Sequence, residues 1–404
     1  MIQTSEGDRE DMKEAKLPRR DWILLPAISL MTICGILASA ECIARRMFTS
    51  TGNLGRYCMI GDNSTGYRGI PNSVCTDKNP ETPLIEYRFN KCGHRTEMEC
   101  GPKPPGTYRI VLVGSSVAMG WTVPEEKAFA ALLPADLSLR TGRRVEVYDE
   151  AYVGEGGTPH NIAVRFNDVQ AAEPDMILWI MTPFDIENTG FKKSAPPMLP
   201  EKAGKTGFLA RVRNRIQEAL AKGSIADEIL ALWKSHSISS MTEHFLYESQ
   251  SLYVKSSLVG PKAEFLRAEP SQEWKEDLQR FDSVAADVEG RAKAAGVPLV
   301  VVFLPNRAHA AIISVGEWPA GYNPYKLDDE LRSIVTSHGG TYIDILPDFQ
   351  SIPNPEQHYY PVDGHPDAEG HLIISGLLAR ALTSGAVPAL KAVVQPQAAK
   401  EQGR

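Results

Sequence analysis

Residues 108–120 read YRIVLVGSSVAMG, a continuous apolar run that ends in glycine and small polar residues. Because the run lacks the apolar–polar alternation of a half-exposed strand, it predicts a β-strand that is buried on both faces. Four similar runs follow, separated by patterns typical of helices. This order predicts a doubly wound, flavodoxin-like α/β fold: a mainly parallel sheet with helices on both faces. The further strands are expected at 145–150, 176–181, 297–305 and 341–346, and the helices at 125–140, 158–172, 272–295, 325–338 and 367–385.

Ser116 lies just past the first strand, with Gly114 before it and Gly120 after it. Sites in sheets of this kind form at the carboxyl ends of the strands, so Ser116 is expected at the catalytic edge. A helix that begins nearby would stabilise negative charge on the hydroxyl. A phosphate-binding turn or a helix cap are the alternatives, although no Gly-Lys-Ser/Thr follows, as a Walker loop would require.

A candidate base and its orienting acid lie near the other end of the chain. Residues 360–371 read YPVDGHPDAEGH, and Asp363 precedes His365 by two positions. A serine nucleophile needs a base, and that base needs a group that orients it. A solvated turn or a pair of metal ligands would also explain an isolated Asp-x-His. His371 is a second histidine, but it falls inside the following helix, where packing is the expected role.

Together these stretches resemble the SGNH/GDSL hydrolases, whose first block reads G-D-S-x-x-x-G. Here the block is GSSVAMG, with Ser116 at the nucleophile position and Ser115 in place of the usual aspartate. The resemblance covers roughly 106–385 and is to large bacterial membrane-anchored members, similar to esterases and polysaccharide O-acetyltransferases. It implies Asp363 and His365 as the other members of a triad, and it implies no metal or organic cofactor.

The resemblance also implies an oxyanion glycine after the second strand. In YDEAYVGEGG (148–157), Gly154 matches best and Gly156 is the alternative. Just past the fourth strand, Asn306 and Arg307 are expected at the edge of the sheet where substrate binds.

The third block of the family departs from its pattern here. The family places an oxyanion-binding Asn before an Asp, but residues 181–188 read MTPFDIEN, so Asp185 fits while Phe184 occupies the Asn position. Thr182, Asn188 or backbone donors alone are the alternatives. Loss of one oxyanion donor costs about 10²–10³ in rate.

Residues 22–40 contain no charged side chain. About 20 apolar residues in a helix cross a hydrocarbon core, so a membrane anchor is expected here. Four basic residues lie within the ten positions before the run and two follow it closely, which favours a cytoplasmic N-terminus. A cleaved signal peptide is the alternative. Either interpretation places the rest of the chain in the periplasm or outside the cell. The basic residues are Lys13, Lys16, Arg19, Arg20, Arg45 and Arg46.

Four of the six cysteines fall between residues 58 and 100, namely Cys58, Cys75, Cys92 and Cys100. In an exported segment this cluster predicts two disulfides, with all three pairings open. A zinc site is the alternative, although no C-x-x-C pair occurs.

The expected organisation is a cytoplasmic tail, an anchor, a Cys-rich region, a catalytic domain with a helical insertion at 190–270, and a loose tail. The respective ranges are 1–20, 21–44, 45–105, 106–385 and 386–404.

The net charge of −7 gives no basic patch for nucleic acid. The expected function is serine-dependent hydrolysis of a small-molecule or glycan ester outside the cytoplasm, through a covalent acyl-enzyme. An O-acyltransferase of envelope polysaccharide and a non-catalytic glycan-binding protein on an SGNH scaffold are the alternatives. The sequence does not indicate the oligomeric state.

Overall fold

The computed structural model describes residues 18, 20–62, 66–187, 189, 237–258 and 261–393. Most of the tail expected at 1–20, much of the insertion expected at 190–270 and the end of the tail expected at 386–404 lie outside these ranges. Asn188 lies outside them as well.

The core of the molecule is a five-stranded parallel sheet in the order β6-β5-β7-β8-β9. This order confirms the doubly wound, flavodoxin-like arrangement. Each strand lies within two residues of its expected position at the start, and β9 ends early, at Ile343. The strands are β5 (Thr107–Val113), β6 (Arg144–Asp149), β7 (Met176–Met181), β8 (Leu299–Phe303) and β9 (Thr341–Ile343).

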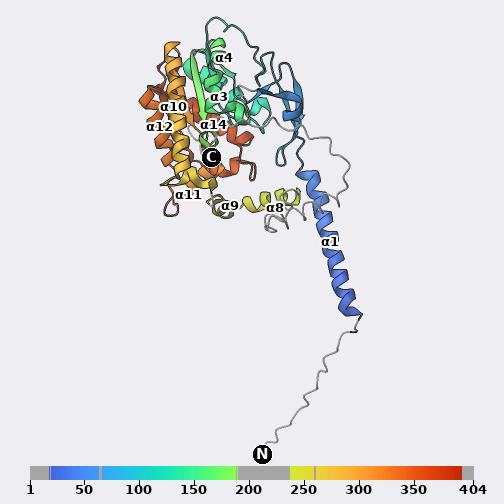
Figure 1. Ribbon diagram of the computed structural model, residues 1–404. Helices are drawn as coiled ribbons and strands as arrows, with labels where there is room; N and C mark the ends of the chain where they lie inside the picture. The colour runs from blue at the N-terminus through green and yellow to red at the C-terminus, as the bar shows by residue number, and fades with distance from the viewer. Residues whose placement is uncertain are drawn as a thin grey trace, which may run out of the picture.

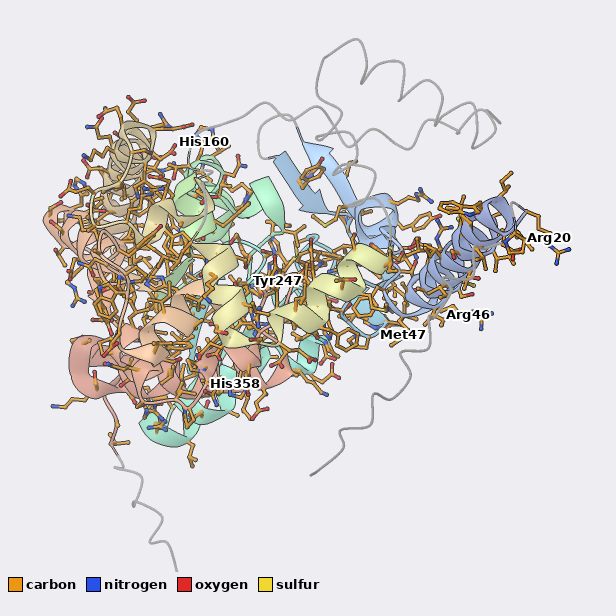
Figure 2. All side chains as sticks on the ribbon, turned by 90° about the horizontal axis from the view of Figure 1, so that it is seen from below. Arg20, Arg46, Met47, His160, Tyr247 and His358 are labelled. Atoms are coloured by element: carbon orange, nitrogen blue, oxygen red, sulfur yellow. A yellow bond between two sulfur atoms is a disulfide. The ribbon has the colours of Figure 1, made fainter. Side chains whose placement is uncertain are left out.

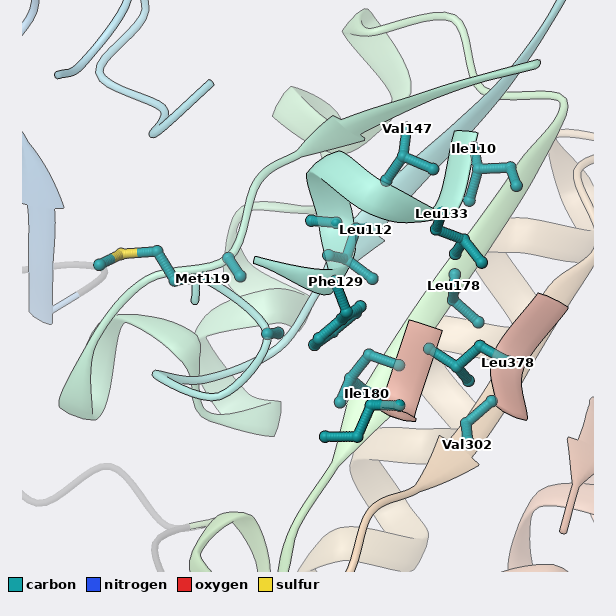
Figure 3. Close-up of a cluster of buried hydrophobic side chains, with 14 of the residues drawn as sticks. Ile110, Leu112, Met119, Phe129, Leu133, Val147, Leu178, Ile180, Val302 and Leu378 are labelled. Atoms are coloured by element: carbon teal, nitrogen blue, oxygen red, sulfur yellow. The ribbon is translucent and has the colours of Figure 1, made fainter. Parts of the chain in front are cut away.

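Helices cover both faces of the sheet, because alternate side chains of each buried strand point to opposite faces. One face packs against α2 (Phe129–Thr141) and α14 (Ala368–Ala381). Figure 3 shows this layer, where Leu112 of the sheet lies beside Phe129 of α2 and Leu178 lies between Leu133 of α2 and Leu378 of α14. The other face packs against α3 (Pro159–Val164), α4 (Phe166–Ala171), α10 (Gln272–Ala294) and α12 (Lys326–His338) (Figure 1).

Two expected helices differ in detail. The one expected at 125–140 starts as a single 3₁₀ turn, η2 (Glu125–Lys127), before α2 begins. The one expected at 158–172 is divided into α3 and α4 at Arg165, whose φ and ψ of −88° and 8° interrupt the helix. An additional helix, α11 (Arg307–Val315), follows β8 directly and is capped by the Asn306 side chain. The shorter elements are α5 (Pro183–Glu187), α13 (Leu346–Gln350), η3 (Gly154–Gly157), η4 (Pro261–Leu266), η5 (Pro355–His358), η6 (Leu382–Ala386) and η7 (Pro388–Leu390).

The Cys-rich region is more ordered than its sequence indicates. It contains two antiparallel hairpins, β1 (Met59–Asp62) with β2 (Gly66–Gly69), and β3 (Val74–Asp77) with β4 (Ile85–Arg88), after the π-helical turn η1 (Leu54–Cys58). Strands of four residues are too short to leave a clear alternation in the sequence. The cysteines form the disulfides Cys58–Cys75 and Cys92–Cys100, as two disulfides were expected.

The apolar N-terminal run forms α1 (Asp21–Met47), which extends away from the domain and is long and apolar enough to cross a membrane (Figure 1). Beside its C-terminal end lies α8 (Ser237–Tyr247), followed by α9 (Gln250–Ser257). At the other end of the chain, Val387 and Leu390 are buried against the domain.

Candidate active site

Ser116 lies in a series of hydrogen-bonded turns directly after β5. The Ser115 and Ser116 carbonyls accept from the amides of Met119 and Trp121, at 3.1 and 3.0 Å. The expected helix does not start here, because α2 begins only at Phe129. Turns rather than a helix N-terminus therefore present the Ser116 hydroxyl at the carboxyl edge of the sheet.

The structure brings Ser116 to Asp363 and His365, which are some 250 residues away in sequence. Ser116 Oγ lies 2.7 Å from His365 Nε2, and His365 Nδ1 lies 2.7 Å from Asp363 Oδ1. With a proton on Nδ1 donated to Asp363, the lone pair of Nε2 faces the serine hydroxyl. The Trp121 ring packs edge-on against the imidazole, with 4.8 Å between ring centroids. The three side chains form one continuous hydrogen-bonded chain.

The histidine is held by a compact loop, residues 359–366, which we call the His365 loop. Tyr360 N donates to the His365 carbonyl and Gly364 N donates to the Tyr360 carbonyl, each at 2.9 Å. His365 N also donates to Asp363 Oδ1 at 3.2 Å. The loop thus fixes the distance between acid and base through its own backbone.

Glu81, on the turn between β3 and β4, supports this loop from the Cys-rich region. Its carboxylate, with only 2% of the side chain exposed, accepts from the amides of Asp363 at 2.7 Å and Val362 at 3.0 Å. Its other oxygen lies 2.6 Å from His244 Nδ1 of α8. Sequence reasoning missed Glu81, since a glutamate in a loop carries no signal of such a contact.

Arg307 supports the same loop from the opposite side. Its guanidinium donates to the carbonyls of Pro361 at 2.7 Å and Tyr247 at 2.6 Å, and it stacks over the Tyr253 ring at 3.8 Å. Burial lowers the pKa of Arg307, and the side chain is only 3% exposed. Arg307 thus holds the backbone of the His365 loop and of the end of α8, and it also lines the cavity into which Ser116 and His365 open.

The loop that carries Gly154 packs directly against the nucleophile turn. Tyr152 N donates to the Gly114 carbonyl at 3.2 Å, and Gly154 has a φ of +56°, in the left-handed region. A Cβ on Gly157 would lie 2.3 Å from the Gly114 oxygen and 2.5 Å from Ser115 Cα, so only glycine fits there. Gly156 approaches Tyr67 instead, since a Cβ there would lie 2.2 Å from the Tyr67 oxygen.

In the third block, residues 181–188, Asp185 holds the loop that follows β7. Asp185 Oδ2 accepts from the Thr182 amide and from the Thr182 hydroxyl, both at 2.7 Å. Burial raises the pKa of Asp185 to about 6, while hydrogen bonds from Thr182 and Ser115 oppose the shift. Because the single hydroxyl proton of Thr182 is used by Asp185, Thr182 is not the missing oxyanion donor. Phe184 is 41% exposed and presents a ring where the family pattern has an amide.

Ser116 and His365 open into a cavity of about 750 Å³. Its walls come from the His365 loop, the Gly154 loop, α9 and the segment that follows α1. Asn306 lines it too, although its side-chain oxygen accepts from His309 N at 2.9 Å and so caps α11. Apolar and aromatic side chains dominate the lining, among them Leu54, Met59, Tyr67, Val117, Trp121, Val153, Phe184, Tyr253 and Tyr359.

His371 is not part of this site. It is fully buried on α14, where its Nδ1 accepts from Phe129 N at 3.3 Å, and burial lowers its pKa to about 3. In the part of the chain that the structure describes, no group of three His, Cys, Asp or Glu side chains is placed to hold a metal ion.

No family model matches the chain, and no curated protein matches it in sequence. Solved structures do match. The chain is similar to TesA, with 10% identity and a TM-score of 0.35 over 68% of this chain and 98% of that one. It is similar to an acetylxylan esterase from Geobacillus stearothermophilus, with 11% identity and a TM-score of 0.36 over 68% and 94%. A third match is the lipase/acylhydrolase from Enterococcus faecalis, with 12% identity and a TM-score of 0.33 over 68% and 95%.

Proposed function

We propose that this protein is a serine-dependent ester hydrolase of the SGNH/GDSL type. The observation that carries the proposal is the hydrogen-bonded chain from Ser116 through His365 to Asp363, with two contacts of 2.7 Å, at the wall of a large cavity. A solvated turn would not explain this chain, because the serine and the histidine come from opposite ends of the domain. This arrangement is the one that activates a serine for acyl transfer.

In the proposed reaction, His365 Nε2 takes the proton from Ser116 Oγ as the oxygen bonds to the ester carbonyl carbon. The proton then passes from His365 to the leaving alkoxide as the ester C–O bond breaks, which leaves an acyl-serine. A water molecule gives a proton to His365 and attacks the acyl-serine, and Ser116 Oγ takes that proton back as the acid leaves. Backbone N–H groups at Ser116 and Gly154 are the proposed donors to the oxyanion.

Asp363 holds the imidazole in the tautomer that this sequence requires and stabilises its positive charge. Phe184 occupies the position of a third donor, so the oxyanion would rely on the backbone. A single missing donor costs about 10²–10³ in rate. We therefore expect turnover well below that of an enzyme with a complete set of donors.

Transfer of the acyl group to a hydroxyl other than water is a second candidate. The observation that favours it is the cavity volume of about 750 Å³, which leaves room for an acceptor beside a short acyl group. A sugar alcohol added to the assay distinguishes the two outcomes, because a transferase forms the acylated alcohol while a hydrolase forms only free acid.

We further propose that α1 anchors the protein, with the N-terminus in the cytoplasm and the catalytic domain in the periplasm or outside the cell. The uncharged run at 22–40 has the length of a bilayer core, and basic residues precede it. Two disulfides in the adjoining region are typical of an oxidising compartment.

The test uses the full chain in detergent and a short-chain aryl ester. Ser116→Ala should lower turnover by about 10⁴-fold or more, as loss of a serine nucleophile does. The matched control is Ser115→Ala, since that neighbouring hydroxyl interacts with Asp185 and should be largely dispensable. Equal turnover by Ser116→Ala and the parent would exclude Ser116 as the nucleophile. A folded parent that neither turns over ester nor reacts with a fluorophosphonate probe would overturn the proposal.

A further inference from the structure

The catalytic edge of the sheet and the N-terminal helix lie on the same side of the molecule. Ser116 follows the end of β5, and α11 begins four residues after the end of β8, so both mark the carboxyl edge. In Figure 1, α11, α9 and α8 form the border of the domain from which α1 departs. The cavity therefore lies at the end of the domain nearest the helix that we propose as an anchor.

The structure fixes α8 at the level where α1 leaves the apolar core. The uncharged run at 22–40 spans about 30 Å as a helix, so Glu41 comes at its very end. The Glu41 carboxylate accepts from the first amides of α8, Ser237 N at 3.3 Å and Ile238 N at 3.0 Å. Phe48 also packs edge-on against His244, with 5.2 Å between ring centroids. A bilayer crossed by α1 would therefore have its interface at α8.

Large apolar side chains are exposed along this same border. They are Phe245 and Leu246 of α8, Leu252 of α9, and Val315 and Trp318 at and just past the end of α11, with exposed fractions of 56%, 48%, 45%, 51% and 37%. We call these five residues the apolar rim. Gln250 Nε2 donates to Ser314 Oγ at 3.0 Å, which joins α9 to the end of α11. Figure 2 shows α8 and α9 crossing the face seen from below, with Tyr247 at the end of α8.

The rim and the cavity are built from the same segments. Tyr253 of α9 lines the cavity one residue after Leu252, and Arg307 ties α8 to the His365 loop through the Tyr247 and Pro361 carbonyls. Other lining residues, Gly52 and Leu54, follow the end of α1 by a few positions. The largely apolar cavity is thus bounded by α9, which carries part of the apolar rim, and by the segment that follows α1.

We propose that the apolar rim rests on the lipid bilayer that α1 crosses, and that the cavity takes an acyl ester dissolved in that bilayer. The occupant of the rim is lipid, because the rim continues from the Glu41 contact at the end of the apolar run. Aromatic side chains such as Trp318 and Phe245 are common where a protein meets a membrane interface. The substrate class rests on the proposed hydrolase activity, whereas the contact between rim and lipid does not.

The contact is tested with the full chain in lipid nanodiscs. The two free cysteines of α1, Cys34 and Cys42, are first replaced by alanine. A fluorophore on Leu252→Cys should be quenched several-fold by phosphatidylcholine that carries a nitroxide near the headgroup. The control is Leu139→Cys, which is 78% exposed and precedes β6, at the opposite edge of the sheet, and it should not be quenched.

Equal, weak quenching at both positions would overturn the contact with lipid. Loss of quenching at Leu252→Cys when each nanodisc holds two chains would also overturn it, because a second copy would then cover the rim in preference to lipid. Quenching at Leu252→Cys that is independent of the number of chains supports lipid as the occupant.

The substrate class is tested with the variant that carries Phe245→Ser, Leu246→Ser and Leu252→Ser. Hydrolysis of a soluble aryl ester should stay within twofold of the parent, while hydrolysis of a fluorogenic long-chain ester dissolved in the nanodisc should fall at least tenfold. Equal loss on both esters, or no loss on the dissolved ester, would overturn the substrate class. A parent inactive on both esters would overturn the proposed activity instead, and the quenching result would still decide the contact with lipid.

Discussion

Glu81→Ala removes the acceptor that holds the His365 loop from the Cys-rich region. The Glu81 carboxylate is almost fully buried and accepts from Asp363 N at 2.7 Å and from Val362 N at 3.0 Å. The residue contacts the loop backbone and does not reach the Ser116 hydroxyl. We therefore interpret Glu81 as a positioning residue for Asp363, and through Asp363 for His365.

The expected loss in kcat follows from the two backbone amides, of Val362 and Asp363, that lose their acceptor in Glu81→Ala. Water reaches Val362, which is 37% exposed, and can replace the lost acceptor there. The amide of Asp363 is partly buried, and a stranded donor of this kind costs about 1–3 kcal/mol. If this cost adds to the barrier of the acyl-transfer step, kcat falls by about 5- to 150-fold. KM should stay within about twofold, because Glu81 lies outside the cavity lining.

The assay is steady-state hydrolysis of a soluble aryl ester by the parent, Glu81→Ala and Glu81→Gln, with folding checked by circular dichroism. Glutamine keeps one acceptor oxygen for Asp363 N, so Glu81→Gln should recover kcat to within about fivefold of the parent. The matched control is Glu86→Ala on β4, whose half-exposed side chain pairs with Arg88 at the surface and should have almost no effect. A folded Glu81→Ala with the kcat of the parent would refute the role in positioning. So would a loss confined to KM.

Burial raises the pKa of Glu150 from 4.5 to about 7 in the folded protein. The carboxyl therefore ionises at lower pH in the unfolded chain than in the folded one, and the unfolding free energy should fall by about 3 kcal/mol between pH 4.5 and 8. Urea unfolding at several pH values should show this fall in the parent and a flatter profile in Glu150→Gln; identical profiles would contradict the buried, neutral carboxyl. Gly157→Ala should lower kcat by about 10²-fold, because the added Cβ displaces the turn that carries Ser116. The control is Gly290→Ala in α10, where a Cβ meets no atom within 4 Å; kcat should stay unchanged and the unfolding free energy should rise by up to about 1 kcal/mol. Replacing Cys58 by serine opens a disulfide between cysteines 17 positions apart and should lower the unfolding free energy by about 3 kcal/mol in a denaturant titration; no change would mean that the bridge is not formed in the purified protein.

The sequence by itself determined the parallel sheet, the position of Ser116 after its first strand and the pairing of Asp363 with His365. These are local properties: a strand buried on both faces is apolar throughout, and an acid two positions from a histidine can reach it without help from the rest of the fold. The pattern also indicated the N-terminal apolar helix and two disulfides, although not which cysteines pair.

Only the tertiary structure brought Ser116 to His365, since contacts between distant segments depend on how the layers pack. It gave Glu81 and Arg307 their roles on the His365 loop, which no local pattern of charged residues encodes. It placed the Thr182 hydroxyl where it donates to Asp185, and the Glu41 carboxylate where it accepts from the first amides of α8. Each of these groups is a common polar side chain that takes its meaning from the backbone atoms placed against it, and those atoms come from other parts of the chain.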